Sequence, residues 1–353
     1  MTKLTWIYNR LKCMSMPEIA YRAYRQLGIS CEQSRWARTA KLAVPEPTIG
    51  PTDFWIPKSP PIKNKERYIQ AANEILKGHL SIFQADVDAY QVIQNWNQDP
   101  KSLVKAPMIF GKKLDYRNES LVGDIKYLWE PNRHLHLVTL AQAYFLTGNR
   151  LYGKAFMLHL RSWIDQCPHP LGPNWSSSLE GAIRLINWSI AWQLIGGCDS
   201  QLFTDEQGKS FRSDWLESIF QHMYFISGHF SRYSSANNHL IGEAAGLFVG
   251  ANTWPYWHAL TDRWRSDSQK ILLREAQKQI HPDGGTCEQA ISYQQFVLDF
   301  LILSLLSARP LGITFPETYL LKIETMIDFI SALMDCKGNM PMIGDADDGF
   351  AVH

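Results

Sequence analysis

Residues 137–163 read LVTLAQAYFLTGNRLYGKAFMLHLRSW. Apolar side chains recur there at intervals of three and four in two blocks, which is the spacing of amphipathic α-helices and not of strands. The turn signal Thr147-Gly148-Asn149 separates the blocks. Because two helices joined by a short loop pack as an antiparallel pair, this stretch predicts an α/α hairpin.

The same pattern continues through most of the chain. A capping box, Ser177-Ser178-Leu179-Glu180, predicts the start of another helix. No strand-like alternation of any length competes, so we expect an all-α fold built from antiparallel helix pairs, either an open solenoid or a closed ring. Further helices are expected at 179–190, 215–230, 239–250, 264–280, 288–307 and 317–334.

The N-terminal 42 residues are basic, with eight Lys or Arg and two Glu. Ser15-Met16-Pro17-Glu18 predicts a capped helix start. The helix can pack on its own domain or make peripheral contact with an anionic membrane. Charges interrupt every apolar stretch, so we expect no signal peptide and a location in the cytoplasm or peripheral to the inner membrane.

Prolines divide the rest of the chain. Six of them lie within residues 43–63, a density that excludes regular helix and predicts an extended arm. We therefore expect a basic helical segment at 1–42, this arm at 43–63 and a helical domain at 64–336, with 337–353 as a short non-helical tail.

Composition excludes several classes of protein. The 353 residues are 45% hydrophobic, enough for a sizeable core, and the net charge of +1 gives no reason to expect nucleic acid. No Gly-rich phosphate loop follows a strand, so a nucleotide fold is not expected. The six cysteines are far apart, and we expect reduced, mostly buried thiols.

A polar run, Ser234-Ser235-Ala236-Asn237-Asn238-His239, precedes a helix rich in Gly and Ala. The small residues allow this helix to lie close to a neighbour, and its N-terminus favours a bound anion. One Asn suffices as an N-cap, and a second Asn followed by His exceeds what capping requires. Glu243 shares a helix face with His239, and we expect a hydrogen bond or ion pair there, with no metal and no cofactor.

Two further groups of residues stand out. Tyr293 follows the turn at 281–285 on a helix that we expect to start at 286–289, where an ordinary half-buried tyrosine explains the pattern. The second group is rich in Trp, Arg and carboxylates. Its Glu180 and Arg184 can form a structural pair, or the group can form a cleft wall that stacks on sugar rings and grips carboxylates. Its members are Lys126, Trp129, Glu130, Asn132, Arg133, His134, Asn174, Trp175, Glu180, Arg184 and Trp188.

Together these motifs resemble the heparinase II/III and alginate-lyase superfamily of polysaccharide lyases, whose N-terminal domain is an incomplete (α/α) toroid. The resemblance runs from the segment 11–23 to the C-terminus. Its most specific pieces are Trp129-Glu130-Pro131-Asn132-Arg133-His134, Ser178-Leu179-Glu180 through Arg184 to Trp188, Asn237-Asn238-His239 through Glu243, and Asp283-Gly284-Gly285 through Glu288-Gln289 to Tyr293.

The resemblance implies β-elimination at a uronic acid in an acidic polysaccharide. Asn238, with Asn237 as the alternate, would neutralise the substrate carboxylate as enolate charge develops. Tyr293 would act as base, acid or both, and its phenol would be activated by nearby positive groups. His239 would share the carboxylate or the proton transfer. Substrate binding would fall to Trp129, Asn132, Arg133, Trp175, Arg184, Asn237, Glu243, Glu288 and Gln289.

In this superfamily an antiparallel β-sandwich follows the toroid and closes the cleft. The pattern turns toward that domain just before His353, so we expect 337–353 to be the start of a truncated C-terminal β domain. Two alternatives to a lyase follow: a non-catalytic helical module that binds polysaccharide or a biosynthetic partner, and a hydrolase that uses two facing carboxylates. The carboxylates available for hydrolysis are Glu180, Asp283 and Glu288.

Overall fold

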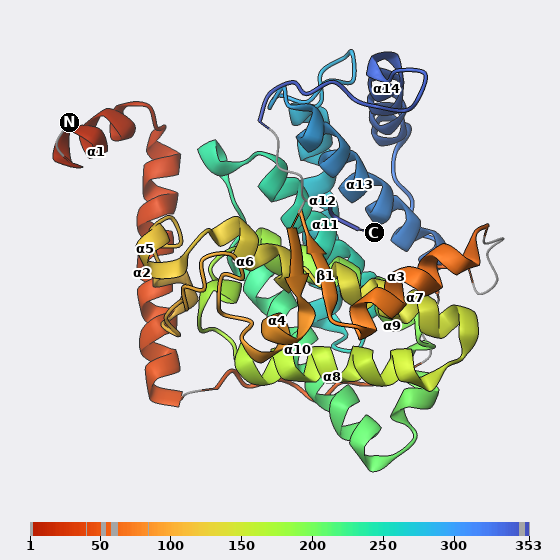
Figure 1. The fold of residues 1–353 in the computed structure, drawn as a ribbon. Helices are drawn as coiled ribbons and strands as arrows, with labels where there is room; N and C mark the ends of the chain where they lie inside the picture. The colour runs from red at the N-terminus through yellow and green to blue at the C-terminus, as the bar shows by residue number, and fades with distance from the viewer. Residues whose placement is uncertain are drawn as a thin grey trace.

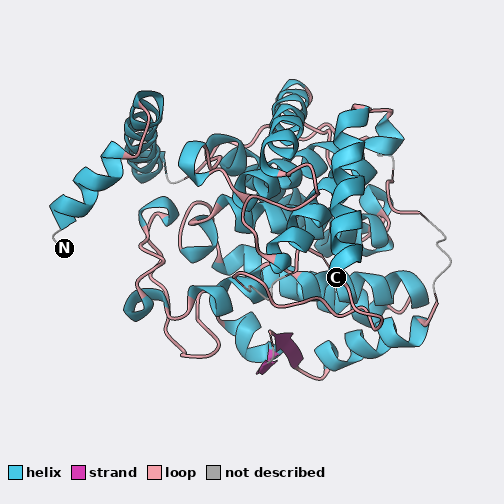
Figure 2. Cartoon of the chain, turned by 90° about the horizontal axis from the view of Figure 1, so that it is seen from above, coloured by secondary structure: helices cyan, strands magenta, loops and turns pink. Residues whose placement is uncertain are grey.

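The computed structural model describes residues 3–39, 41–50, 54–57, 63–83, 85–345 and 350–352. Part of the expected proline arm and of the C-terminal tail lies outside these ranges. Helices dominate the described chain (Figures 1 and 2). They are α1 (Lys3–Lys12), α2 (Met16–Thr39), α3 (Lys65–Leu76), α4 (Ala89–Gln94), α5 (Glu119–Val122), α6 (Ile125–Asn132), α7 (Leu135–Thr147), α8 (Arg150–Gln166), α9 (Ser178–Leu194), α10 (Glu206–Gly228), α11 (Asn238–Thr253), α12 (Ala259–Gln279), α13 (Ile291–Ala308) and α14 (Glu317–Leu333).

The opening hairpin of the sequence forms as predicted. Helices α7 and α8 pack against each other, and α7 ends where Gly148 adopts φ 66°. Such a left-handed residue commonly ends a helix, and glycine adopts it without steric cost. Helices α10, α11, α12 and α14 also lie where the periodicity placed them, which confirms the predicted all-α incomplete toroid.

Helices α9 and α11 form the centre of the core, and α11 also packs against α12 and α13. A Cβ atom at Gly246 would lie 2.5 Å from the carbonyl oxygen of Ala182, so glycine is required for this close approach. The expectation that small residues bring α11 close to a neighbour is confirmed. Helix α13 has the length and composition of a membrane span, but more than half of that segment is buried in the core.

One small sheet was not predicted. Strands β1 (His79–Ile82) and β2 (Ala85–Asp88) pair antiparallel, with His79 opposite Asp88 and Ile82 opposite Ala85. Each strand has four residues, too short for an alternating pattern to be recognised in the sequence. The hairpin lies at the periphery of the helices (Figure 2), and its turn residue Phe83 has a φ of 54°.

Helix α2 runs along one side of the body (Figure 1). Ser15 Oγ accepts a hydrogen bond from the Glu18 N–H, which confirms the predicted cap. Arg22 donates to Ser234 and Ser235, and Tyr21 donates to the carbonyl of Phe230. The helix therefore packs on its own domain, against the loop that leads into α11.

Several local expectations were wrong. Helix α9 starts where the capping box predicted, but the side chain of Ser177 makes no cap hydrogen bond. Helix α13 starts at Ile291, after the positive φ of Gln289, and not within 286–289. Of the six cysteines, Cys167 is buried and Cys198 is partly buried, whereas the other four are exposed.

The C-terminal tail returns to the middle of the helices (Figure 1). Residues 337–345 and 350–352 contain no helix or strand. Ala351 is fully buried, and its carbonyl accepts a hydrogen bond from Asn187 Nδ2 on α9 at 3.1 Å. Ser292 Oγ at the start of α13 donates to the carbonyl of Asp345.

Candidate functional site

The N-terminus of α11 carries the first part of the site. Asn237 is its N-cap, and its Oδ1 accepts a hydrogen bond from the His239 N–H at 3.1 Å. The next residue, Asn238, is buried and lies against Glu288 from the loop before α13. Its backbone N–H donates to Glu288 Oε1 at 2.7 Å, and its side-chain Nδ2 donates to Oε2 at 2.8 Å.

The Glu288 carboxylate is therefore the anion at this helix end, a favourable place for negative charge. Its two contacts fix the side-chain amide of Asn238. A carboxamide nitrogen carries two N–H donors, so one remains for a ligand. Glu288 thus contacts Asn238 and orients its side-chain amide.

A cavity of about 290 Å³, called the site cavity here, joins α11 to α13. Asn238 and His239 line it from α11, and Tyr293 lines it from α13. The structure therefore brings together all three residues expected to be catalytic. Its other lining residues are Phe83, Tyr116, Arg117, Ile125, Lys126, Trp129, Glu130, Arg133, Leu179, Glu180, Ser292 and Phe296.

The half-buried phenol of Tyr293 donates to Asp345 Oδ2 at 3.2 Å. We expected positive groups near this phenol, and Arg117, Lys126 and Arg133 do line the same cavity. The phenol thus has a carboxylate partner in a cavity whose lining contains three basic residues and the two glutamates that pair with Arg133.

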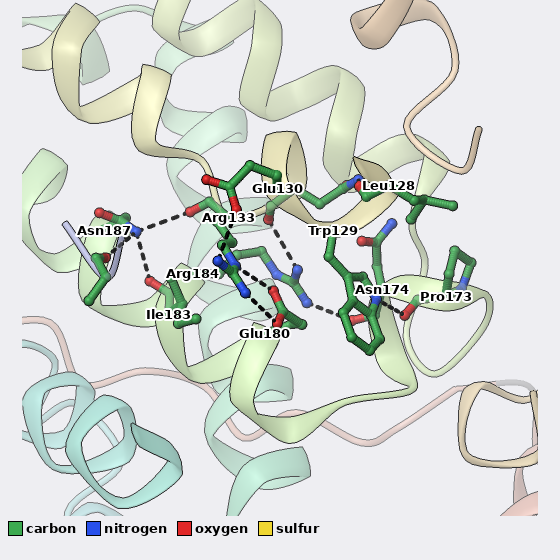
Figure 3. Close-up of polar contacts among 12 residues, drawn as sticks. Leu128, Trp129, Glu130, Arg133, Pro173, Asn174, Glu180, Ile183, Arg184 and Asn187 are labelled. Atoms are coloured by element: carbon green, nitrogen blue, oxygen red, sulfur yellow. Dashed lines mark hydrogen bonds and ion pairs between the residues drawn. The ribbon is translucent and has the colours of Figure 1, made fainter. Parts of the chain in front are cut away.

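Arg133 is held by two carboxylates (Figure 3). Its Nε and Nη2 donate to Glu180 at 2.9 and 3.0 Å, and its Nη1 donates to Glu130 at 2.9 Å. This fork-shaped pairing suits guanidinium and carboxylate geometry. Glu180 therefore pairs with Arg133, and the expected pair with Arg184 does not form.

Trp129 stands beside this group. Its ring lines the site cavity, and its Nε1 donates to the carbonyl of Pro173 at 3.1 Å. The hydrogen bond fixes the indole, so its exposed part offers an apolar surface of the kind on which a sugar ring can pack.

Arg184, expected to bind substrate, lies in the interior. It is fully buried, and burial lowers its pKa to about 10. Its Nε donates to His222 Nε2 at 3.0 Å, and its two terminal nitrogens donate to the carbonyls of Asn132 and Asn174. Figure 3 shows it directed into this hydrogen-bonded core.

Asn132 and Trp175 are also buried. Asn132 accepts from Trp163 Nε1 and donates to two backbone carbonyls, and Trp175 Nε1 donates to the carbonyl of Cys167. The structure does not bring these two residues or Arg184 to the site cavity. Their polar groups are taken by backbone and side-chain partners in the interior.

Glu243 is buried one turn into α11 and does not line the site cavity. Its carboxylate accepts from the Ser231 N–H at 2.6 Å and from Ser231 Oγ at 2.8 Å. Burial is the main cause that raises its pKa to about 7. Gln289 is exposed and likewise lies outside the cavity lining.

The hairpin turn and the loop before α5 contribute residues that the motifs did not single out. Phe83 and the pair Tyr116-Arg117 line the site cavity. Adjacent aromatic and basic residues in a loop were a detectable signal for Tyr116-Arg117. No comparable signal marks Phe83, since its position depends on the unpredicted hairpin.

The carboxylates considered for hydrolysis are separated. Glu180 lines the cavity but is bound to Arg133, Glu288 is bound to Asn238, and Asp283 accepts from the Gly285 N–H in an exposed turn. No two of these three face each other across the site cavity, which is the arrangement that paired-carboxylate hydrolysis requires.

Known proteins resemble this chain in sequence and in fold. A family model described as heparinase II/III N-terminus matches residues 61–351. A heparin-sulfate lyase of Pedobacter heparinus is 25% identical over 246 residues, and one of Bacteroides stercoris is 26% identical over 260 residues. Each match covers 67% of this chain, and the chain spans 35% and 37% of these relatives.

Solved structures show the same fold. Heparan sulfate lyase HepC from Pedobacter heparinus superposes with a TM-score of 0.54 at 19% identity, covering 92% of this chain and 45% of that one. A crystal structure of heparinase III gives a TM-score of 0.57 at 17% identity, covering 89% and 45%. The chain thus spans less than half of these larger proteins.

Proposed function

Because the chain belongs to the heparinase II/III N-terminal family, we propose that this lyase-type domain cleaves a uronic-acid-containing polysaccharide by β-elimination. The observation that carries the proposal is the meeting of Asn238, His239 and Tyr293 in one cavity, whose lining also contains three basic residues. We favour elimination over binding alone because this reaction uses both a proton-transfer group and a hydrogen-bond donor for the carboxylate, and a phenol and an amide line the same cavity.

The reaction requires removal of the C5 proton next to a carboxylate. That proton becomes acidic enough only when the carboxylate charge is neutralised, because negative charge spreads onto it in the transition state. The free N–H of Asn238 and the cations Arg117 and Lys126 would provide this stabilisation. Donors that are already oriented need little reorganisation as the charge develops.

Tyr293 would then carry the proton transfer. Once its own proton has passed to solvent, the phenolate would take the C5 proton, and the phenol formed in that step would protonate the C4 oxygen as the C4–O bond breaks. Asp345 accepts a hydrogen bond from the phenol, and His239, which lines the same cavity, would share the carboxylate or the proton. The products are a new reducing end and a 4,5-unsaturated uronate.

The test uses the full chain and a panel of uronate polymers. Formation of the unsaturated product is followed by its ultraviolet absorbance, with Asn238→Ala as the matched control. A rise in absorbance that depends on Asn238 is expected. No unsaturated product from any polymer in the panel would overturn the proposal.

A further inference from the structure

A larger cavity of about 730 Å³, called the distal cavity here, adjoins the site cavity. The two share four lining residues, Phe83, Glu130, Ser292 and Phe296. Because these residues border both spaces, the cavities are successive parts of one cleft. A polymer bound at Tyr293 would extend into the distal cavity in one of its two directions.

The basic residues are concentrated at one end of this cleft, where Glu130 and Glu180 also line the wall. Arg117, Lys126 and Arg133 line the site cavity, whereas no Lys or Arg is among the described residues that line the distal cavity. Four carboxylates line the distal cavity instead. They are Glu74, Asp86, Glu130 and Asp299.

Three of these carboxylates are already paired. Glu74 accepts from Lys77 at 2.9 Å, Asp86 lies 3.0 Å from His79, and Glu130 accepts from Arg133. Lys77 balances Glu74, whereas Arg133 is shared by Glu130 and Glu180, and the exposed Asp86 is balanced only when His79 is protonated. Each of these three carboxylates nevertheless has a partner within the protein.

Asp299 differs from the other three. It is half-buried on α13, and the structure gives it no hydrogen-bond or ion-pair partner among the described residues. Burial raises the pKa of its carboxyl to about 6, and no cation offsets that burial. An unpaired, partly desolvated carboxyl in a cavity is unfavourable for folding, which is typical of a ligand-binding position.

His136 supplies a second unsatisfied group. It lines the same cavity and is 6% exposed, and its Nε2 has no hydrogen-bond partner among the described residues. Burial lowers the pKa of its imidazole well below the usual value, so the ring is neutral near pH 7. The Nε2 atom is shielded from solvent, so the ring borders the cavity without adding positive charge to it.

We infer that the distal cavity binds an amino sugar next to the uronate held at Tyr293, an inference that rests on the proposed function. The nitrogen of this sugar would be a free ammonium group, recognised by Asp299. Asp299 follows Tyr293 by six residues, which is about 9 Å along the helix axis. That separation is comparable with the length of a disaccharide. Phe83 and Phe296 offer apolar surface for the ring between them.

The same charges discriminate between forms of the nitrogen. An ammonium group would pair with Asp299, which lacks a partner in the protein. An N-acetyl group is neutral and forms no ion pair, and an N-sulfo group would bring negative charge into a cavity already lined by carboxylates. Recognition therefore favours the free amine over both modified forms.

The experiment measures binding of three tetrasaccharides to the full chain by calorimetry at pH 7.5. Each alternates uronate with glucosamine, and they differ only in a free, N-acetylated or N-sulfated nitrogen. The amine form is expected to bind at least about tenfold tighter than the other two, as a charge-assisted hydrogen bond allows. Asp299→Asn should remove that preference, whereas Asp328→Asn, on the exposed part of α14 outside the cavity, should retain it.

Cleavage of the same three compounds separates this inference from the proposed function. Cleavage without an amine preference would overturn the inference and leave the proposed function standing. Preferential binding of the amine without cleavage would support the inference and contradict the proposed function. Equal or tighter binding of the N-sulfated form, a preference retained in Asp299→Asn, or no binding of any form would each overturn the inference.

Discussion

Glu288 holds Asn238 by two hydrogen bonds, one to the backbone N–H at 2.7 Å and one to the side-chain nitrogen at 2.8 Å. Fifty residues separate the pair in the sequence. One carboxylate thereby neutralises the end of α11 and orients the amide that would contact substrate. The catalytic contribution of Asn238 should consequently depend on Glu288.

Glu288→Ala is expected to lower kcat about 10- to 100-fold in the proposed reaction, because the Asn238 amide loses its fixed orientation. The measurement is a double-mutant cycle with Asn238→Ala, read as initial rates of unsaturated product. If the two residues act together, the double variant should be no slower than Asn238→Ala alone. Independent, additive losses would contradict the positioning role.

Replacing Arg133 by Ala should destabilise the fold by about 3 kcal/mol, because the buried Glu180 carboxylate would lose the guanidinium that donates two hydrogen bonds to it. Urea unfolding followed by circular dichroism measures this change. Lys209→Ala is the matched control, since its ion pair with Glu206 is exposed and such pairs contribute little. Equal small effects for both variants would refute the account of Arg133.

Asp299 should make stability depend on pH. The folded-state pKa of its carboxyl is raised to about 6 from an ordinary value of 3.8, so its neutral form is the favoured one in the folded protein. The favourable contribution of the neutral Asp299 carboxyl to the free energy of unfolding is fully present below about pH 4. It is lost as the pH rises through about 6. Asp299→Asn should therefore be more stable than the parent at pH 7.5, by on the order of 1–2 kcal/mol after allowance for partial exposure.

The control for this prediction is the same pair of proteins at pH 4, where the difference should shrink. Melting temperatures at the two pH values provide the measurement. A variant that gains stability and loses amine recognition would show that Asp299 is retained for binding. A destabilised variant at pH 7.5 would refute the pH argument.

Peripheral membrane contact through α2 stays a prediction. One side of α2 is bound to the loop at 230–235, while Met16, Tyr24 and Leu27 are exposed. We expect flotation with anionic vesicles at low salt and weaker flotation with neutral vesicles. Leu27→Glu should reduce it, and absence of the parent from the vesicle fraction would remove the membrane interpretation.

The helices could be predicted from sequence because their apolar periodicity is a local signal. Gly148 marked a helix end, and Gly246 marked a close helix contact. The polar run at Asn237 correctly marked the N-terminus of α11. Resemblance then supplied the roles proposed for Asn238 and Tyr293, which periodicity alone did not distinguish from a cap and a core residue.

The partners of the site residues could not be predicted, because they depend on contacts between distant segments. Arg184 looked like a ligand for carboxylates since arginine is rarely fully buried, yet the fold surrounds it with backbone carbonyls and His222. Glu180 was assigned to Arg184, one turn away, although the toroid brings Arg133 closer. Asp299 gave no signal, because its isolation arises only when the cavity forms.

The most direct test of the central claim compares Tyr293→Phe with the parent chain in the ultraviolet assay for unsaturated uronate. The substitution removes the hydroxyl that would transfer the proton and keeps the ring on α13. The account predicts a loss of at least about 100-fold in kcat with little change in melting temperature. Full activity of the Phe variant would contradict it.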